Sequence, residues 1–145
     1  GTIRGNIIRD IKRSERHDSK KSAIYLDENS GQWTVEKNII VECDYPFFCH
    51  MTREGNLFVN NVALSENSHE INILCLRSKL LSFENNIIKC NNDIIFHLTS
   101  GAIKTINSNY IDCLNHNLMV YRYNEYAQVG ESIIDLIDIR SMEKI

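Results

Sequence analysis

Short apolar stretches alternate with polar ones along the whole chain, and they recur at a regular interval. Asparagines at positions 6, 38, 61, 86 and 109 are each followed by two apolar residues, at steps of 32, 23, 25 and 23 residues. An apolar residue lies three positions before each of the last four: Val35, Phe58, Phe83 and Ile106. The 3.6-residue period of a helix is absent, so the pattern predicts short strands joined by turns.

A second apolar segment recurs in the same rhythm, at residues 23–26, 47–51, 71–76, 94–98 and 118–121. An interval of about 23 residues fits one coil of three short strands with their turns, whereas helical repeats are usually longer. Leucine-rich repeats share this period, but their leucine consensus is missing. We therefore predict an all-β fold: a parallel β-helix of about five coils, 23–25 residues each, forming a single domain over residues 1–145.

Equivalent residues of stacked coils lie above one another, because parallel strands pair about 4.8 Å apart. The recurring asparagines are therefore expected to form a ladder of side-chain amides that also holds left-handed turns. We interpret Asn38, Asn61, Asn86 and Asn109 as this turn ladder and not as a functional site. Two cysteines follow their asparagines by four residues and are expected to stack as small residues, reduced or only incidentally bonded: Cys90 and Cys113.

The composition excludes several classes of protein. A formal net charge of −3 gives no reason to expect a nucleic-acid partner, which usually requires a basic face. No apolar run approaches the roughly 18 residues of a membrane span. Five cysteines without a C-x-x-C pair argue against both a full disulfide framework and a zinc site. Buried free thiols are the simpler interpretation.

The stretch Ala23-Ile24-Tyr25-Leu26-Asp27-Glu28-Asn29-Ser30-Gly31, followed by Val35-Glu36-Lys37-Asn38-Ile39-Ile40, resembles the pectate-lyase-like superfamily of right-handed parallel β-helix proteins. It is similar above all to secreted bacterial members with an I-Y-L-D-D-x-S-G strand and a V-x-x-N-I-I turn; Glu28 departs from the second aspartate. The repeat covers the whole chain and the sharper motif only residues 23–40. The resemblance is specific for fold and weak for activity, since this superfamily includes lyases, glycosidases, epimerases, tailspikes and adhesins.

The resemblance implies a coil of strand PB1, turn T1, PB2, a short asparagine turn T2, PB3 and a variable turn T3. It also implies that substrate lies along the outer face of PB1, walled by T3 loops. The interval from Asn6 to Asn38 is about nine residues longer than the others, and these extra residues fall in one T3 loop, Asp10–Ser22. Its basic residues are either a solvated surface or contacts for the carboxylates of an acidic sugar: Arg13, Arg16, His17, Lys20 and Lys21.

Strand alternation predicts which side chains of PB1 face outward. The residues expected outside are Tyr25, Asp27, Phe48, His50, Thr52, Ile95, His97 and Thr99, and those expected inside are Ile24, Leu26, Phe47, Cys49, Met51, Ile94, Phe96 and Leu98. Asp27 and His50 would then be neighbours on adjacent coils, about 5 Å apart.

An aspartate beside a histidine suits general acid–base catalysis, so we select Asp27 and His50 as candidate catalytic residues. Glu28 is a third candidate, provided that the turn redirects it to the same face, because glycosidases use two carboxylates. Tyr25, Phe48 and Tyr121 are expected to form an outward aromatic column for sugar stacking, with His97 two coils beyond His50. The alternative is that these residues cap a turn, pack under the 10–22 loop or have no role.

We therefore expect a polysaccharide lyase or glycoside hydrolase, or part of one, acting on an acidic or plant-type glycan. The alternative is a non-catalytic glycan-binding or structural module of a surface protein or phage tailspike. A secreted, periplasmic or cell-surface location follows from either. No cofactor and no metal site are expected, since no acidic cluster is dense enough to indicate calcium. The chain is expected to be the C-terminal part of a longer one, with 131–145 as its last strand or cap.

Overall fold

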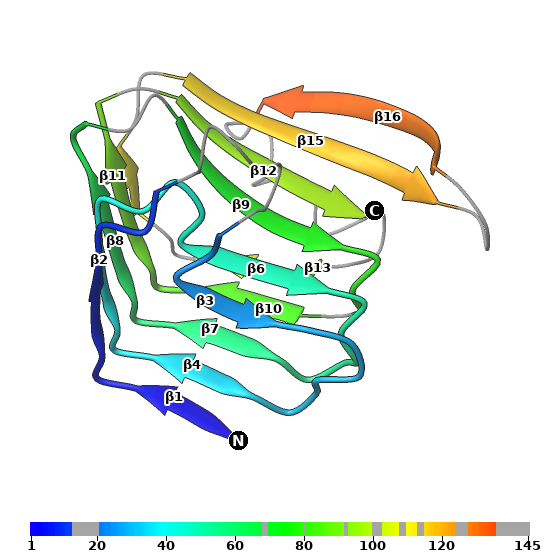
Figure 1. Ribbon diagram of the computed structural model, residues 1–145. Coiled ribbons are helices and arrows are strands. Elements are labelled where there is room, and N and C mark those ends of the chain that lie inside the picture. Colours follow the sequence, from blue (N-terminus) through cyan, green and yellow to red (C-terminus); the bar gives the residue numbers. More distant parts are fainter. Residues whose placement is uncertain are drawn as a thin grey trace.

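The computed structural model describes residues 1–12, 21–67, 70–79, 81–91, 93–99, 103–107, 110–112, 115–123 and 128–135, with side chains described in 1–12, 21–67, 73–79 and 81–91. These residues are all-β, and none of them is helical. Successive strands join three different sheets in turn, and the sheets face a common interior (Figure 1). This arrangement is consistent with the predicted parallel β-helix.

The described strands form two sheets of five strands and one of six. Sheet A runs in the order β1 (Thr2–Arg4), β4 (Thr34–Glu36), β7 (Leu57–Val59), β10 (Leu81–Glu84), β13 (Ile103–Asn107). Sheet B runs in the order β2 (Ile7–Arg9), β5 (Ile39–Val41), β8 (Val62–Ser65), β11 (Ile87–Cys90), β14 (Tyr110–Asp112). Sheet C runs in the order β3 (Ile24–Leu26), β6 (Phe47–His50), β9 (Glu70–Leu76), β12 (Asp93–Thr99), β15 (Asn115–Tyr123), β16 (Gln128–Asp135). Between the described strands, every pairing is parallel except that of β15 with β16, which is antiparallel.

The resemblance implies strands PB1, PB2 and PB3 around residues 23–27, 33–36 and 39–41, and these correspond to β3, β4 and β5. The expected last strand or cap, 131–145, overlaps β16 as far as Asp135, and residues 136–145 lie outside the described part. Its capping role therefore stays a prediction.

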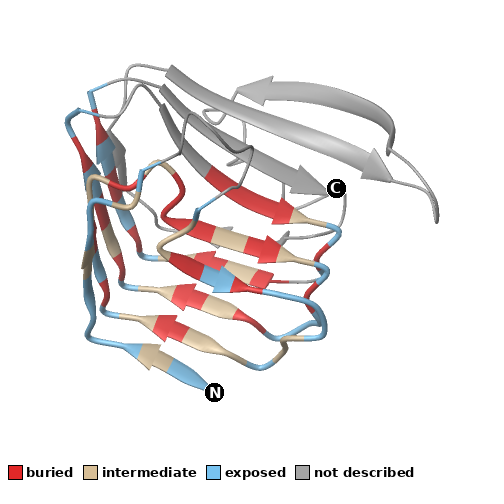
Figure 2. Ribbon diagram, viewed as in Figure 1, coloured by how far each residue is buried: buried red, intermediate tan, exposed pale blue. Residues whose placement is uncertain are grey.

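The interior is filled by columns of equivalent apolar residues. In sheet A, Val35, Phe58 and Phe83 are in register and at most 3 % exposed. In sheet B, Ile40, Ala63 and Ile88 form the corresponding column. Figure 2 shows this alternation in strands such as β4 and β7, where a buried residue lies between less buried neighbours. The period of two expected for strands with one buried face is therefore present in the described coils.

The asparagine ladder runs through the corner between sheets A and B. The side chain of Asn61 is buried; its Oδ1 accepts hydrogen bonds from the backbone N–H (3.1 Å) and Nδ2 (2.9 Å) of Asn38. Its Nδ2 donates to Asn86 Oδ1 (2.9 Å) and to the carbonyl of Val35 (2.9 Å). Asn6 joins the ladder through Asn38, while Asn109 lies outside the described residues.

The left-handed conformation falls one residue before each described ladder asparagine, not on it. Positive φ occurs at Gly5 (68°), Lys37 (54°), Asn60 (56°) and Asn85 (52°). The expectation that the ladder asparagines themselves hold the left-handed turn was therefore wrong. The physical reason is that two neighbouring residues have different roles. The first turns the backbone, and the asparagine after it directs its side chain into the corner, where it hydrogen-bonds to backbone groups that have no partner in a sheet.

Cys43, Cys49 and Cys75 are free and buried. Cys90 is disulfide-bonded, and Cys113, the residue expected to stack with it, lies outside the described residues.

A second polar network stabilises the corner after sheet B. The Glu42 carboxylate accepts hydrogen bonds from the backbone N–H groups of Glu66 (2.8 Å) and Asn67 (3.3 Å), and from the hydroxyl of Ser65 (3.3 Å). Lys12 Nζ lies 3.2 Å from the same carboxylate. Partial burial alone would raise the pKa of Glu42, but these amide hydrogen bonds and the lysine lower it overall.

We expect Glu42→Gln to lower stability at pH 7 by about 1–2 kcal/mol, because charge-assisted hydrogen bonds are lost. A lowered pKa in the folded state stabilises the protein above the usual value of 4.5. That stabilisation is lost as the pH falls through the folded value, so the difference between parent and variant should shrink in acid. Urea unfolding at several pH values from 7 to 3 measures this stability difference. The control is Glu66→Gln, which removes an exposed carboxylate one coil further along. A difference that stays constant with pH would contradict this account.

Candidate functional site

The candidate site lies where β3 and β6 end, on the outer face of sheet C. These strands pair in register, with Tyr25 opposite Phe48 and Leu26 opposite Cys49. The inward residues Leu26 and Cys49 are buried, whereas Tyr25 is 47 % exposed. The residues that follow, Asp27 and His50, are therefore neighbours on adjacent strands.

The two corners at this edge have the same length, but their left-handed residues stand at different positions. In the second coil, Met51 follows His50 directly and takes a positive φ of 52°. In the first coil, Glu28 stands between Asp27 and the left-handed residue, Asn29 (φ 62°). The N–H of Asn29 donates to the carbonyl of Met51 (3.2 Å). Leu26 pairs with Cys49 and Thr34 with Leu57, so Glu28 takes the place that Met51 has in the second coil, and the left-handed residue comes one position later.

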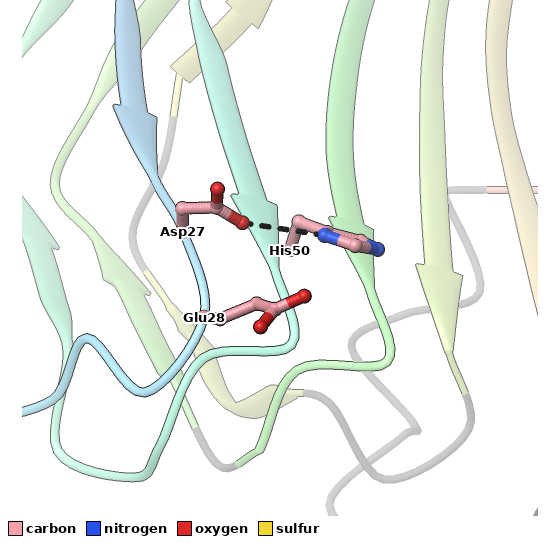
Figure 3. Close-up of side chains that lie close together, drawn as sticks. All are labelled: Asp27, Glu28 and His50. Carbon is pink, nitrogen blue, oxygen red and sulfur yellow. Dashed lines mark hydrogen bonds and ion pairs between the residues drawn. The ribbon is translucent and has the colours of Figure 1, made fainter.

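The turn brings Glu28 to the same side as Asp27 and His50 (Figure 3). The N–H of Ser30 donates to the carbonyl of Asp27 (3.0 Å) and closes a β-turn with Asn29 as its left-handed residue. One donor atom from each of Asp27, Glu28 and His50 lies within 4.8 Å of the others. The condition set for Glu28, that the turn must redirect it, is met.

Asp27 is the centre of a polar network. His50 Nδ1 lies 3.3 Å from Asp27 Oδ1, and the side chains are 31 % and 56 % exposed respectively. The Asp27 carboxylate also accepts hydrogen bonds from the backbone N–H of Glu28 and from the hydroxyl of Tyr25. With its proton on Nδ1, His50 donates to Asp27 and leaves Nε2 free.

These contacts fix the protonation of two of the groups. The hydrogen bond from the Glu28 amide, followed by those from Tyr25 and His50, lowers the pKa of Asp27. Partial burial, the hydrogen bond to Asp27 and the nearby negative charges raise the pKa of Tyr25 to about 12. At neutral pH Asp27 is therefore an anion that accepts hydrogen bonds, and Tyr25 is a neutral donor. Asp27 is suited to orienting His50, and it is a poor proton donor itself.

The aromatic column is shorter than expected. Tyr25 and Phe48 stack with ring centroids 4.7 Å apart and planes inclined by 15°. In the same column the following strands place Leu74 and then His97. Tyr121 pairs with Thr99, two residues beyond His97, so its expected place beside Tyr25 and Phe48 was wrong. Because strands β12 and β15 pair in a register fixed over seven residues, Met119 takes that position instead.

Two further side chains face differently from expectation. Thr52, expected outside, is 2 % exposed, and Met51, expected inside, is 39 % exposed. Strand β6 ends at His50, and the positive φ of Met51 turns the backbone, so the alternation stops there.

Six of the expected substrate contacts are left without a described side chain. Tyr121 and His97 lie in β15 and β12, where only the backbone is described. The loop residues Arg13, Arg16, His17 and Lys20 lie outside the described residues. Sequence reasoning missed Arg53, whose Nε donates to Asn29 Oδ1 (3.2 Å) and which therefore places a cation on the same edge. Arg53 follows His50 in the turn of the second coil, just as Asn29 follows Asp27 in the turn of the first. This matching turn in the repeat was the signal that could have pointed to Arg53.

No protein-family model, curated protein or solved structure matches this chain. Among the described residues, no helix has the length and apolar character needed to cross a membrane.

Proposed function

We propose that the chain is a right-handed parallel β-helix of the pectate-lyase-like type that processes a polysaccharide on the outer face of sheet C. The observation that supports this is the network of Tyr25, Asp27 and His50 across two adjacent strands. It combines a fixed carboxylate, an imidazole and an exposed aromatic residue on one open surface. A polysaccharide substrate implies a secreted, periplasmic or cell-surface location. The disulfide at Cys90 agrees with such an oxidising compartment.

In this proposal His50 transfers the proton. Asp27 accepts the Nδ1 proton, which holds the ring and leaves Nε2 as the base. In a lyase, Nε2 would remove the proton next to a uronate carboxylate, and the bond from the neighbouring ring carbon to the glycosidic oxygen would break. Arg53, held at the same edge by Asn29, would balance the developing negative charge. In a hydrolase, the protonated ring would donate to the glycosidic oxygen. Asp27 acts through His50 and is a positioning residue.

The two carboxylates do not support an inverting hydrolase. Such enzymes separate their carboxyl groups by about 6.5–9.5 Å to accommodate a water molecule. Donor oxygens of Asp27 and Glu28 lie within 4.8 Å of each other. The lowered pKa of Asp27 also argues against its acting as the acid. The proposal therefore rests on the imidazole and not on a carboxylate pair.

A non-catalytic glycan-binding module is the second candidate. It is favoured by the openness of the site, because the Asp27 side chain is 56 % exposed and Tyr25 is 47 % exposed. Catalytic electrostatics are strongest where water is excluded, whereas stacking on an exposed aromatic ring requires no such exclusion.

Turnover of pectate, alginate, chondroitin and xylan separates the two candidates, read both as reducing ends and as absorbance of unsaturated uronates. Loss of the proton-transfer group should lower kcat/KM of His50→Ala by about 10²–10⁴-fold. Asp27→Asn should lower it less, since the imidazole remains. Glu54→Gln, an exposed carboxylate in the next turn, is the control and should keep parental activity. Full activity in His50→Ala would overturn the catalytic role, and glycan binding without turnover would favour the binding module.

A further inference from the structure

We infer that Asp27, Glu28 and His50 form a surface site for a divalent transition-metal cation of the Zn²⁺ type. Each residue offers one donor atom, and these three atoms lie within 4.8 Å of one another (Figure 3). The set combines one imidazole nitrogen with two carboxylate oxygens. Such mixed donors are typical of zinc, copper, nickel and non-haem iron sites.

The closest donor pair already has the separation that a shared cation requires. Zinc lies about 2.0–2.2 Å from its nitrogen and oxygen ligands, so two ligands at tetrahedral or octahedral angles stand roughly 3.0–3.5 Å apart. His50 Nδ1 and Asp27 Oδ1 are 3.3 Å apart, which is long for a charge-assisted hydrogen bond. A cation can therefore replace the proton that these two atoms share with little rearrangement.

The third ligand comes from the turn that follows Asp27. In the next two coils the left-handed residues Met51 and Arg77 come directly after β6 and β9, whereas in the first coil Glu28 stands at that place and Asn29 is the left-handed residue. Glu28 is exposed, and its side chain can swing to close the remaining distance to the pair. Glu28 thus supplies a second carboxylate at a corner where an aspartate and a histidine adjoin.

The donor set selects the class of cation. Calcium takes six to eight oxygen ligands, and this cluster supplies only two carboxylates and a nitrogen that calcium does not favour. Three protein ligands on an exposed surface leave positions for water, as in open zinc sites. This inference does not rest on the proposed glycan chemistry. Because it uses the same pair, a bound cation and proton transfer by His50 exclude each other.

Calorimetric titration of the whole chain with Zn²⁺ in the absence of glycan tests the site, together with the visible absorption spectrum of bound Co²⁺. We expect this binding to be lost in His50→Ala and to weaken by at least about tenfold in Glu28→Gln. Glu54→Gln should bind like the parent. Circular dichroism should show every variant folded without metal, since all three ligands lie at the surface. If His50→Ala does not fold, the Zn²⁺ affinity of Glu28→Gln alone tests the site.

Zn²⁺ affinity that is the same in Glu28→Gln and His50→Ala as in the parent would overturn the inference, because the cation would then be held by other histidines. Absence of Zn²⁺ binding by the parent would also overturn it. Neither result concerns glycan turnover. Conversely, a chain that is inactive on every glycan but loses Zn²⁺ in His50→Ala would keep this site and reject only the proton-transfer proposal.

Discussion

Asn61→Ala is expected to lower the free energy of unfolding by about 3–5 kcal/mol, since each buried polar group left without a partner costs about 1–3 kcal/mol. Asn61 is fully buried in the corner between sheets A and B. Its removal leaves the N–H of Asn38 and the carbonyl of Val35 without their hydrogen bonds of 3.1 and 2.9 Å. Asn86 Oδ1 keeps the backbone N–H of Asn61 (3.0 Å), so it is not orphaned.

The neighbouring residue provides the matched control. Asn60 is exposed and has a φ of 56°, so Asn60→Gly preserves the turn and removes only a surface side chain. We expect it to change stability by less than about 1 kcal/mol. Urea unfolding of both variants at one pH measures the difference. Equal losses in the two variants would show that the ladder contributes no more than an ordinary turn residue.

Phe47→Ala is expected to lower the free energy of unfolding by about 3–5 kcal/mol, the usual cost of truncating a buried phenylalanine. Phe47 is 1 % exposed and is the aromatic contact between sheets C and A. Its ring lies 5.3 Å from that of Phe58 and 5.8 Å from that of Phe83, both edge-on. Removing it leaves a cavity where two sheets meet, and a domain of marginal stability would be largely unfolded.

Phe48→Ala is the control for this second prediction, because it removes the same side chain from the opposite face of the same strand. Phe48 is half-buried and stacks on Tyr25, so we expect a loss of about 1 kcal/mol. Thermal and urea unfolding compare the two variants. A larger loss for Phe48→Ala than for Phe47→Ala would mean that β6 faces the other way and that the candidate site is misplaced.

Local pattern was enough to predict which residues face inward within a strand. Ile24, Leu26, Phe47 and Cys49 were expected inside and are buried. The alternation depends only on the two-residue period of an extended backbone, which each strand carries in its own sequence. It failed at Met51 and Thr52, because the positive φ of Met51 is decided by where the strand ends and the next coil pairs.

Register between distant coils was harder to predict. Tyr121 was placed in the column of Tyr25 although it pairs two residues further on, opposite Thr99. Segments of equal hydrophobicity can slide by two residues without moving any side chain to the wrong face, so the apolar pattern does not distinguish the two registers. Only the pairing along the full length of β12 and β15 fixes it.

By itself the sequence determined the repeat, the asparagine ladder and the proximity of Asp27 to His50, because all three follow from a spacing of about 23 residues and strand alternation. The tertiary structure decided the chemistry of the pair. Tyr25 donates to Asp27, and Glu28 turns toward His50. The place of Glu28 depends on which residue of the turn is left-handed, Asn29 here and Met51 in the next coil, and the apolar pattern of the sequence does not determine that residue.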